Sequence, residues 1–217
     1  MALSNTPVAR EITEPDGRTL AGRWVRLDAI GDADFGELGA LLGDPRVYEH
    51  GYVMHRRPSS PADATELART TFGATAGKIR YAIRLAADSD LGPAGTLVGT
   101  SGLSEIDLRN ESTHIGGTLY GPRWWGTQVN PEAKMLLLAH CFDDRGFGRV
   151  KIQTDRLNTR SQAAIARLGA IREGVLRRHM KREDGSFRDT VVYSVLENEW
   201  PEVRTRLLER LAPRQQP

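Results

Sequence analysis

The chain alternates between segments with strand periodicity and segments with helix periodicity, and this order limits the possible folds more than any other feature. Apolar residues recur at every second position in some segments and at every third or fourth position in others, which are the periods of strands and helices. Strands are predicted at residues 24–30, 80–86, 96–107, 112–120 and 149–156, with a hairpin at 175–200 that turns at Asp184-Gly185. Helices are predicted at residues 32–44, 59–73, 131–145, 159–170 and 201–212, the second with Ser60 as N-cap and the third ended by Gly146. This order predicts a mixed α/β layer fold around one sheet.

The two ends of the chain depart from this pattern. Residues 1–18 are polar and contain two prolines and a glycine, so we expect a flexible N-terminal arm. Residues 213–217 are expected to form a flexible tail. No repeat, low-complexity tract or linker divides the remainder, and 217 residues are enough to bury a sizeable core. Residues 19–212 are therefore predicted to form a single domain.

Charge and cysteine content argue against several classes of partner. The 30 basic and 28 acidic side chains give a net charge of +2, which provides no general attraction for nucleic acid or an anionic membrane. No apolar run approaches the roughly 20 residues that span a bilayer. Residues 1–17 lack the basic start and apolar stretch of a signal peptide. Cys141 is the single cysteine and is expected in the core with Leu137 and Leu138. We expect a cytoplasmic protein without disulfides.

The segment YGPRWWGTQVNPEAKMLLLAHCF (120–142) joins a glycine-bearing strand to a strongly apolar helix. Asn130 followed by Pro131 predicts an N-cap and a first helical residue, with Gly126 just upstream. The first turn of a helix has unpaired N–H groups and a partial positive charge, and a nearby glycine lets the backbone approach an anion closely. The segment is thus either a phosphate-binding site or an ordinary turn and cap. A Walker loop is excluded because no Gly-Lys-Ser/Thr follows, and the three spaced glycines of a nicotinamide site are absent.

A second motif, LNTRSQAAIARLGA (157–170), places Asn158 at the end of a strand and Ser161 in the first turn of a helix. Together with LVGTSGLSEID, THIGGTLYGPRWWGTQVNPEAKMLLLAHCF, RVKIQTDR and DTVVYSVLENEW, this motif resembles the GNAT superfamily of acyl-CoA N-acyltransferases, in its RimJ/RimL-like branch. The resemblance covers about residues 20–200. It implies a GNAT fold, with a central, mostly antiparallel sheet, a parallel splayed pair of strands at the acyl-CoA site and helices on both faces.

The resemblance also implies where acyl-CoA binds. The expected contacts lie along one strand, in the following loop and at the next helix: Gly117, Thr118, Leu119, Tyr120, Arg123, Trp125, Gly126, Thr127, Gln128, Val129, Asn130, Asn158 and Ser161. Trp124 and Trp125 are expected to wall this groove or brace the loop, and packing between the helix and the sheet is the alternative. Gln128 replaces a small residue that is usual in the superfamily, and its side-chain amide can itself donate to phosphate. Helix capping is the alternative role for Asn158.

Transfer to an amine requires the loss of a proton from the attacking nitrogen, because an alkyl amine is almost wholly protonated at neutral pH. Glu105, at the end of a predicted strand, is the predicted base, and His114 is the second candidate. A solvated surface position is the alternative for both. The resemblance implies that a strand N–H, here that of Leu119, stabilises the oxyanion. It also implies that Ser161 protonates the departing thiolate.

The link between the first two helices, residues 44–60, is predicted to bind the acceptor through Tyr48, His50 and Tyr52. Its histidines lack metal-ligand spacing, so no metal site is predicted. The expected donor is acetyl-CoA or another short acyl-CoA such as succinyl-CoA. The expected acceptor is a primary amine of a small molecule or of a protein N-terminus.

Two other functions stay open from the sequence. The Gln128 substitution and the unassigned base are compatible with a non-catalytic, acyl-CoA-binding regulatory module. A basic cluster at residues 177–182 is compatible with RNA binding, although alternation along a strand would distribute its charges over both faces. The chain is expected to be either a monomer or a homodimer that pairs through an edge strand or the last helix.

Overall fold

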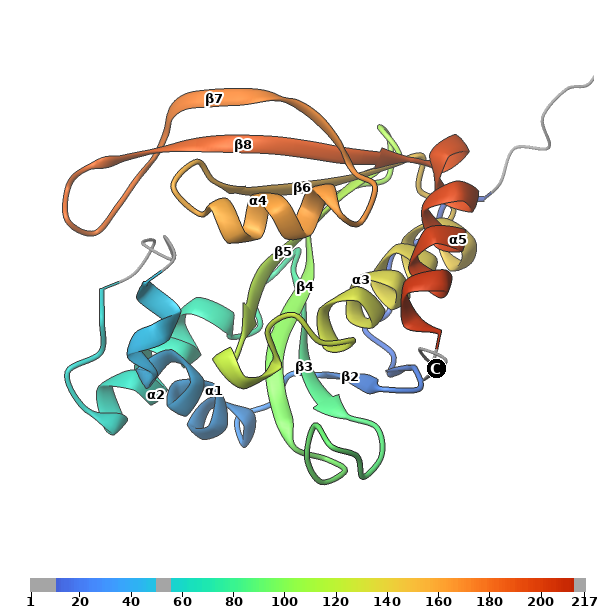
Figure 1. Ribbon diagram of the computed structural model, residues 1–217. Helices are drawn as coiled ribbons and strands as arrows, with labels where there is room; N and C mark the ends of the chain where they lie inside the picture. The colour runs from blue at the N-terminus through green and yellow to red at the C-terminus, as the bar shows by residue number, and fades with distance from the viewer. Residues whose placement is uncertain (1–10, 50–55, 213–217) are drawn as a thin grey trace, which may run out of the picture.

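A computed structural model describes residues 11–49 and 56–212 of the chain. Its strands form one eight-stranded sheet with the order β1-β2-β3-β4-β5-β6-β8-β7 (Figure 1). The strands are β1 (Leu20–Ala21), β2 (Val25–Ala29), β3 (Ile79–Leu85), β4 (Leu97–Asp107), β5 (Ser112–Tyr120), β6 (Arg149–Asp155), β7 (Ile171–Lys181) and β8 (Phe187–Leu196). The helices are α1 (Asp34–Gly43), α2 (Pro61–Phe72), α3 (Val129–Ala139), α4 (Thr159–Ala166) and α5 (Trp200–Leu211). This is the predicted order of elements, with the short β1 added at one edge.

The sheet is antiparallel except near its middle, where β5 and β6 run parallel. These two strands pair only through residues 112–115 of β5 and 149–152 of β6. Beyond that point they diverge, so residues 116–120 and 153–155 are not partners in the sheet. The prediction of a mostly antiparallel sheet with a parallel, splayed pair is confirmed. The divergence leaves a gap between two half-sheets.

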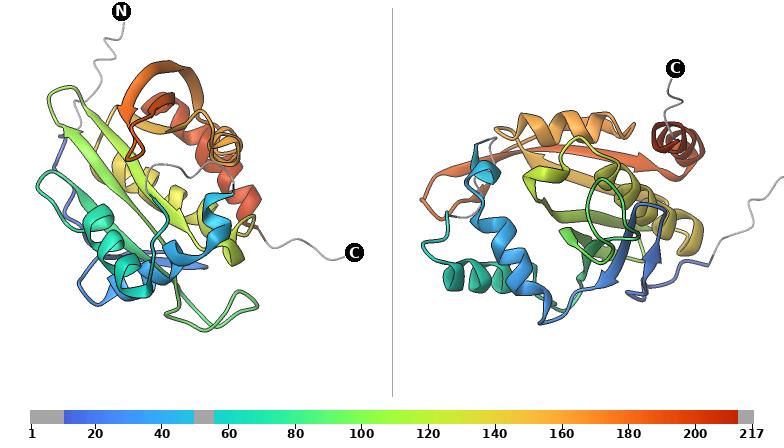
Figure 2. Two further views of the ribbon diagram at one scale, coloured as in Figure 1. Left: turned by 90° about the vertical axis from the view of Figure 1, so that its left-hand side faces the viewer. Right: turned by 60° about the horizontal axis from the view of Figure 1, so that its bottom comes forward.

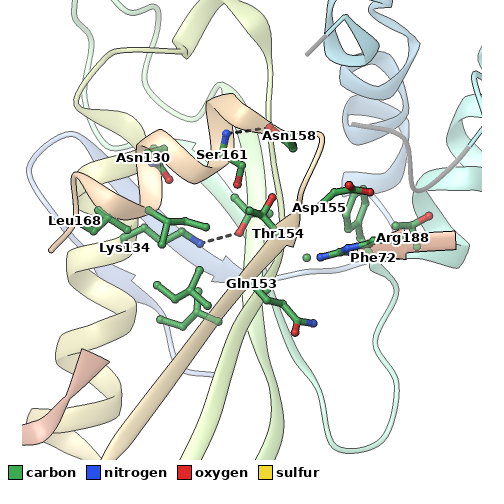
Figure 3. A pocket seen from close by; sticks show the side chains of 18 residues that line it. Phe72, Asn130, Lys134, Gln153, Thr154, Asp155, Asn158, Ser161, Leu168 and Arg188 are labelled. Carbon is green, nitrogen blue, oxygen red and sulfur yellow. Dashed lines mark hydrogen bonds between the residues drawn. The ribbon is translucent and has the colours of Figure 1, made fainter. Parts of the chain in front are cut away.

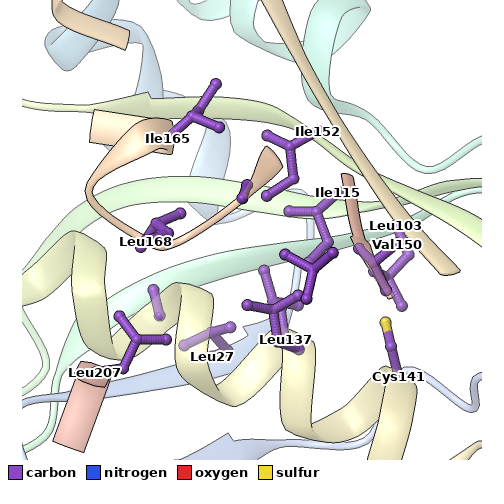
Figure 4. Packing of buried hydrophobic residues seen from close by; sticks show 14 of the residues in the cluster. Leu27, Leu103, Ile115, Leu137, Cys141, Val150, Ile152, Ile165, Leu168 and Leu207 are labelled. Carbon is purple, nitrogen blue, oxygen red and sulfur yellow. The ribbon is translucent and has the colours of Figure 1, made fainter. Parts of the chain in front are cut away.

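Helices cover both faces of the sheet (Figures 1 and 2). On one face α1 and α2 pack over a smaller core that includes Phe35, Leu38, Leu42, Leu67, Phe72, Ala82 and Leu119. On the other face α3, α4 and α5 pack over the larger core, part of which is shown in Figure 4. The alternation along β3 follows from strand geometry, since Tyr81 and Ile83 belong to the larger core and Ala82 to the smaller one. Cys141 is fully buried in the larger core, as predicted.

The start of α3 differs from the prediction. The helix begins at Val129 rather than at Pro131, and Asn130 is not its N-cap. Gln128 occupies the N-cap position without a side-chain cap bond, while the Thr127 hydroxyl accepts a hydrogen bond from the Val129 N–H at 3.3 Å. Proline is tolerated throughout the first turn, where backbone N–H groups have no helical partner. The presence of Pro131 therefore could not identify the first residue of the helix.

The predicted N-cap Ser60 is confirmed, and Asn158 forms the cap that was its alternative role. The Ser60 side chain accepts from the Asp63 N–H at 3.2 Å at the start of α2, with Pro61 as the first helical residue. The Asn158 side chain accepts from the Ser161 N–H at 2.9 Å at the start of α4. Both bonds satisfy an N–H group that the first helical turn leaves unpaired. Asn158 is thereby held at the end of β6, beside the gap.

A buried carboxylate fixes α3 to the edge of the sheet. Glu132 accepts hydrogen bonds from the backbone N–H groups of Arg23, Trp24 and Val25 at 2.9, 2.6 and 2.7 Å. These groups lie at the turn that joins β1 and β2. A side chain on Gly22 would clash with this carboxylate, because a Cβ there would lie 2.6 Å from the Glu132 Cδ atom. Glu132 therefore ties the first turn of α3 to the β1–β2 turn.

The described part of the N-terminal arm, residues 11–18, contains neither helix nor strand. It lies against the π-helical residues 140–144 that follow α3, where Arg18 pairs with Asp144 at 2.5 Å and Asp16 pairs with Arg145. Residues 1–10 of the expected arm and the expected tail at 213–217 lie outside the described residues. Among the residues that the structure describes, no helix has the length and apolarity needed to cross a bilayer.

Candidate active site

The gap between β5 and β6 opens into a cavity of about 220 Å³ (Figure 3). Its lining comes from both faces of the sheet, with Phe72 of α2 on one side and Lys134 of α3 and Ser161 of α4 on the other. A second cavity of about 160 Å³ continues from it toward the loop before α3. The two cavities share Thr118, Asn130, Asn158, Ser161 and Ala164. Together they form one continuous groove along the diverging half of β5.

A bulge shapes the wall of this groove. The register between β4 and β5 shifts between Thr100 and Gly102, so β5 has one residue more than β4 there. Gly117 adopts φ +60° in this bulge. A Cβ at Gly117 would lie 2.3 Å from the Arg80 Nη1 atom, so no other residue fits without displacement. The bulge faces β6 at the point where the two strands have separated, and leaves this edge of β5 open to a ligand.

The loop before α3 presents backbone donors to the second cavity. Gly126 has φ +77°, and no atom lies within 4 Å of the place where its Cβ would be. Within the described part of the chain, the amides of Gly126, Thr127 and Gln128 donate no hydrogen bond. Such amides at the start of a helix favour an anion. Of these three residues, Gly126 and Thr127 line the second cavity and Gln128 lines neither cavity.

The two tryptophans brace this loop. Trp125 donates from Nε1 to the Tyr120 carbonyl oxygen at 2.9 Å, and Trp124 donates from Nε1 to the Leu91 carbonyl oxygen at 3.1 Å. The Trp125 ring also carries the Arg160 guanidinium over its face, 3.3 Å from the ring centroid. Both tryptophans line the second cavity. Each tryptophan therefore lines the second cavity and also holds the loop through its Nε1 hydrogen bond.

Three arginines give the second cavity a positive charge. Arg160 lines it from α4, Arg167 from the position directly after α4, and Arg210 from α5. None of them forms an ion pair with a carboxylate among the described residues. Burial lowers the pKa of Arg160, and burial together with the charge of Arg167 lowers the pKa of Arg210. Unpaired guanidinium groups beside free loop amides form a site suited to a polyanion.

Asn158 and Ser161 line both cavities. The Asn158 Oδ1 atom is used in the cap of α4, whereas its Nδ2 group donates no hydrogen bond among the described residues. Ser161 donates its backbone N–H to that cap, and its hydroxyl makes no hydrogen bond within the same part of the structure. Each residue therefore has one structural function and one free polar group at the groove.

The two predicted bases, Glu105 and His114, lie close together but line neither cavity. His114 Nδ1 lies 3.3 Å from Glu105 Oε1 and 3.2 Å from Ser104 Oγ, and the buried Nε2 atom has no described partner. Glu105 sits in a second bulge with φ +52°, is 56% exposed and pairs with Lys151 at 2.5 Å. Burial lowers the pKa of His114 to about 4, so the imidazole is neutral at pH 7. Burial alone would raise the pKa of Glu105, but Lys151 and His114 lower it overall.

Lys134 is an ionisable group of the groove that was not predicted from the sequence. Its Nζ atom donates to Thr118 Oγ1 at 2.7 Å and to Ser101 Oγ at 2.9 Å, and these hydroxyls bond each other at 2.8 Å. The residue is 4% exposed, lines the larger cavity and has no carboxylate partner among the described residues. Burial, with a smaller effect from Arg80, lowers its pKa to about 7. A lysine with this pKa is partly neutral at physiological pH.

Comparison with known proteins agrees with this geometry. Residues 25–171 match the family model described as an acetyltransferase (GNAT) domain. A crystal structure of an inferred acetyltransferase from T. thermophilus shares 34% identity over 89% of this chain and 97% of that chain, with a TM-score of 0.76. The chain belongs to the GNAT acetyltransferase family. A search of curated proteins found no match.

Two further structures show how widely this GNAT fold is shared. A GCN5-related N-acetyltransferase from Brucella melitensis is 26% identical, with a TM-score of 0.82 over 94% of this chain and 89% of that chain. RimJ of Mycobacterium smegmatis, solved with CoA-disulfide, is 20% identical, with a TM-score of 0.69 over 93% of this chain and 97% of that chain. The second likeness is one of fold.

The described residues of this GNAT domain fit an acyl-CoA molecule. The unpaired amides of Gly126 and Thr127 and the three arginines suit phosphate groups, and the open edge of β5 suits a peptide-like arm. Ten predicted coenzyme residues line the cavities: Gly117, Thr118, Leu119, Tyr120, Trp125, Gly126, Thr127, Asn130, Asn158 and Ser161. Three do not: Arg123, Gln128 and Val129.

The predicted acceptor residues are only partly described. Tyr48 closes the short helix at residues 45–48, donates its hydroxyl to the Arg56 carbonyl oxygen at 3.4 Å and lines neither cavity. His50 and Tyr52 lie outside the described residues. Among the residues that are described, no cluster of three or more His, Cys, Asp or Glu could hold a metal ion.

Proposed function

We propose that this GNAT domain is an N-acyltransferase of the RimJ/RimL-like branch. It moves acetyl or another short acyl group from acyl-CoA to a primary amine of a small molecule or protein N-terminus. The single observation that carries the proposal is the groove at the diverging half of β5, open to a peptide-like chain and ending in free amides and unpaired arginines. This combination suits one elongated ligand with a polyanionic end.

The donor lies in this groove with its phosphates at the loop before α3. The amides of Gly126 and Thr127 and the guanidinium of Arg160 hold the phosphates, and the Asn158 Nδ2 group donates to the peptide-like arm. Bound acyl-CoA supplies an activated acyl group on a thiol leaving group. The larger cavity receives that acyl group and the acceptor.

The chemistry forms a C–N bond and breaks the C–S bond of the thioester. A protonated amine loses two protons over the reaction, one before it attacks and one as the amide forms, and the departing thiolate gains one. Of Glu105, His114 and Lys134, only Lys134 lines the cavity, so in this proposal its neutral amine accepts the first proton. The Ser161 hydroxyl donates a proton to the thiolate and is reprotonated by the second proton that leaves the nitrogen. The Glu105–His114 pair is the alternative base, with Nε2 of His114 as the accepting atom.

Calorimetric titration with acetyl-CoA, succinyl-CoA and free coenzyme A tests the donor site. We expect micromolar binding that Gly126→Asp abolishes, because its carboxylate would repel the phosphates at an otherwise open position. Gly126→Asn is the matched control, since asparagine has the same shape without the charge and tolerates positive φ. Equal binding by both variants would place the phosphates elsewhere.

Turnover is measured as release of free coenzyme A with a panel of amines. Acylation of at least one amine, with the product identified by mass, supports the enzyme. Tight acyl-CoA binding without acylation of any amine would instead favour a non-catalytic regulatory module. No binding to any of the three ligands would contradict both functions.

A further inference from the structure

Arg188 is a buried cation on the wall of the larger cavity (Figure 3). It lies near the start of β8 and is 8% exposed. Its Nε atom is buried without a hydrogen-bond partner, and the guanidinium forms no hydrogen bond or ion pair with any described residue. Guanidinium groups stay protonated in proteins, so this is a fixed positive charge. Burial lowers its pKa, and Arg182 adds to this effect while Asp155 opposes it.

Asp155 is the carboxylate that acts electrostatically on Arg188, and it is already paired with other groups. Asp155 pairs with Arg182 at 2.6 Å and accepts a hydrogen bond from the Leu157 N–H at 2.9 Å. Two guanidinium groups thus face one carboxylate, which leaves one positive charge uncompensated. The residues outside the described part of the chain, 1–10, 50–55 and 213–217, contain no aspartate or glutamate. No side chain of this protein is therefore available to neutralise Arg188 from those segments.

Arg188 also lies away from the place that suits the phosphates of the donor. The phosphate-binding arginines line the second cavity, whereas Arg188 lines only the larger one. Its neighbours in the lining are Gln153 and Asp155 at the end of β6 and Phe72 of α2 (Figure 3). Phe72 belongs to the core between α1, α2 and the sheet, opposite the face that α3 covers. The charge thus marks the side of the gap from which a second molecule can enter.

We propose that Arg188 binds a carboxylate of the acceptor, so that the substrate is an amino acid or a similar small amino carboxylate. This inference rests on the proposed acyltransferase function. A guanidinium and a carboxylate can form two parallel hydrogen bonds, which would satisfy the buried charge and orient the amine toward the donor. A cavity of about 220 Å³ that also receives the acyl group suits a small acceptor.

The test compares amino acids with the amines obtained by removing their carboxylate. The pairs are phenylalanine with phenethylamine, leucine with 3-methylbutylamine and methionine with 3-(methylthio)propylamine, all with acetyl-CoA as donor. We expect kcat/KM to favour the amino acid of at least one pair by about 30-fold or more, the size of a lost hydrogen bond to a charged group. Arg188→Gln should remove most of this preference by raising KM for the amino acid, and Arg188→Lys should restore part of it.

Arg177→Gln is the matched control, because Arg177 is an exposed arginine of β7 that lines neither cavity. It should leave the preference unchanged. Thermal unfolding of all variants checks that they fold, and the amine partner of each pair checks that catalysis persists.

If amines are acylated without preference for a carboxylate, or the preference survives in Arg188→Gln, this inference is wrong while the proposed acyltransferase function stands. If Arg188→Gln lowers the rate of transfer from succinyl-CoA but not from acetyl-CoA, whichever acceptor is used, Arg188 binds the acyl group of the donor and the inference also fails. Acyl-CoA binding without acylation of any amine would remove the proposed function itself.

Discussion

Burial sets the protonation state of Lys134, and this state decides whether the residue can accept a proton. The amine is enclosed by α3 and β5 and donates to two hydroxyls, with no carboxylate beside it among the described residues. Enclosure without a negative partner disfavours the charged form and brings the pKa to about 7. A base is most effective when its pKa lies near the working pH. His114, with a pKa near 4, is always neutral at pH 7 but is a weaker base.

The pH dependence of kcat/KM separates these two residues. With one acceptor throughout, kcat/KM of the wild type should rise as the pH passes about 7, because below this value Lys134 is protonated and cannot accept a proton. Lys134→Met should remove the inflection near pH 7, leaving only the rise that comes from deprotonation of the acceptor amine, and lower kcat/KM by about 10²–10⁴-fold, the usual contribution of a general base. Glu105→Gln is the control and should keep the inflection. An inflection near pH 7 that persists in Lys134→Met would exclude this role.

The residues of the site differ in how far the sequence could reveal them. Asn158, Ser161 and the residues of the loop at Gly126 were predicted because they lie in short, contiguous motifs. Lys134 left a weaker signal, a single charge that helical spacing places on the same face as Leu137 and Leu138. Arg188 left none, because its burial depends on elements distant in the chain, α2 and β6.

At the scale of elements, two bulges explain why the predicted base lies away from the groove. Glu105 was predicted as the base from its place at the end of a strand, but each bulge inserts a residue and reverses the alternation of side chains beyond it. Glu105 lies in one bulge and turns toward Lys151 of β6. Gly117 lies in the other and sets the wall of the groove. The order of elements was predictable from hydrophobic periods, whereas the bulges were not.

The bond between Glu132 and the β1–β2 turn is testable at the same scale. Glu132→Gln should lower the free energy of unfolding by about 1–3 kcal/mol, because an amide cannot satisfy three buried N–H donors and brings donors of its own. Urea unfolding followed by circular dichroism gives this value. Glu202→Gln, at an exposed position of α5, should change it by less than about 0.5 kcal/mol. A similar decrease in the free energy of unfolding in both variants would show that the three hydrogen bonds of Glu132 do not contribute more than a surface interaction.

At the scale of the whole molecule, the overall charge conceals a local imbalance. The net charge of +2 is small, yet five cations without a carboxylate partner among the described residues lie along one path through the two cavities: Arg210, Arg167 and Arg160, then Lys134, then Arg188. This path begins at the second cavity and ends on the opposite face of the sheet. Composition therefore excluded a general polyanion partner without excluding a specific anionic substrate.

The gap between β5 and β6 has a consequence for the order of events in turnover. The lining of this gap reaches from Lys134 on one face of the sheet to Phe72 on the other. The acyl donor and the acceptor can therefore enter from opposite faces of the sheet. Neither has to depart before the other arrives, and no acyl group needs to be stored on the protein in between. Double-reciprocal plots of initial rate against acyl-CoA, at several fixed amine concentrations, should therefore intersect; parallel lines would reveal an acylated enzyme.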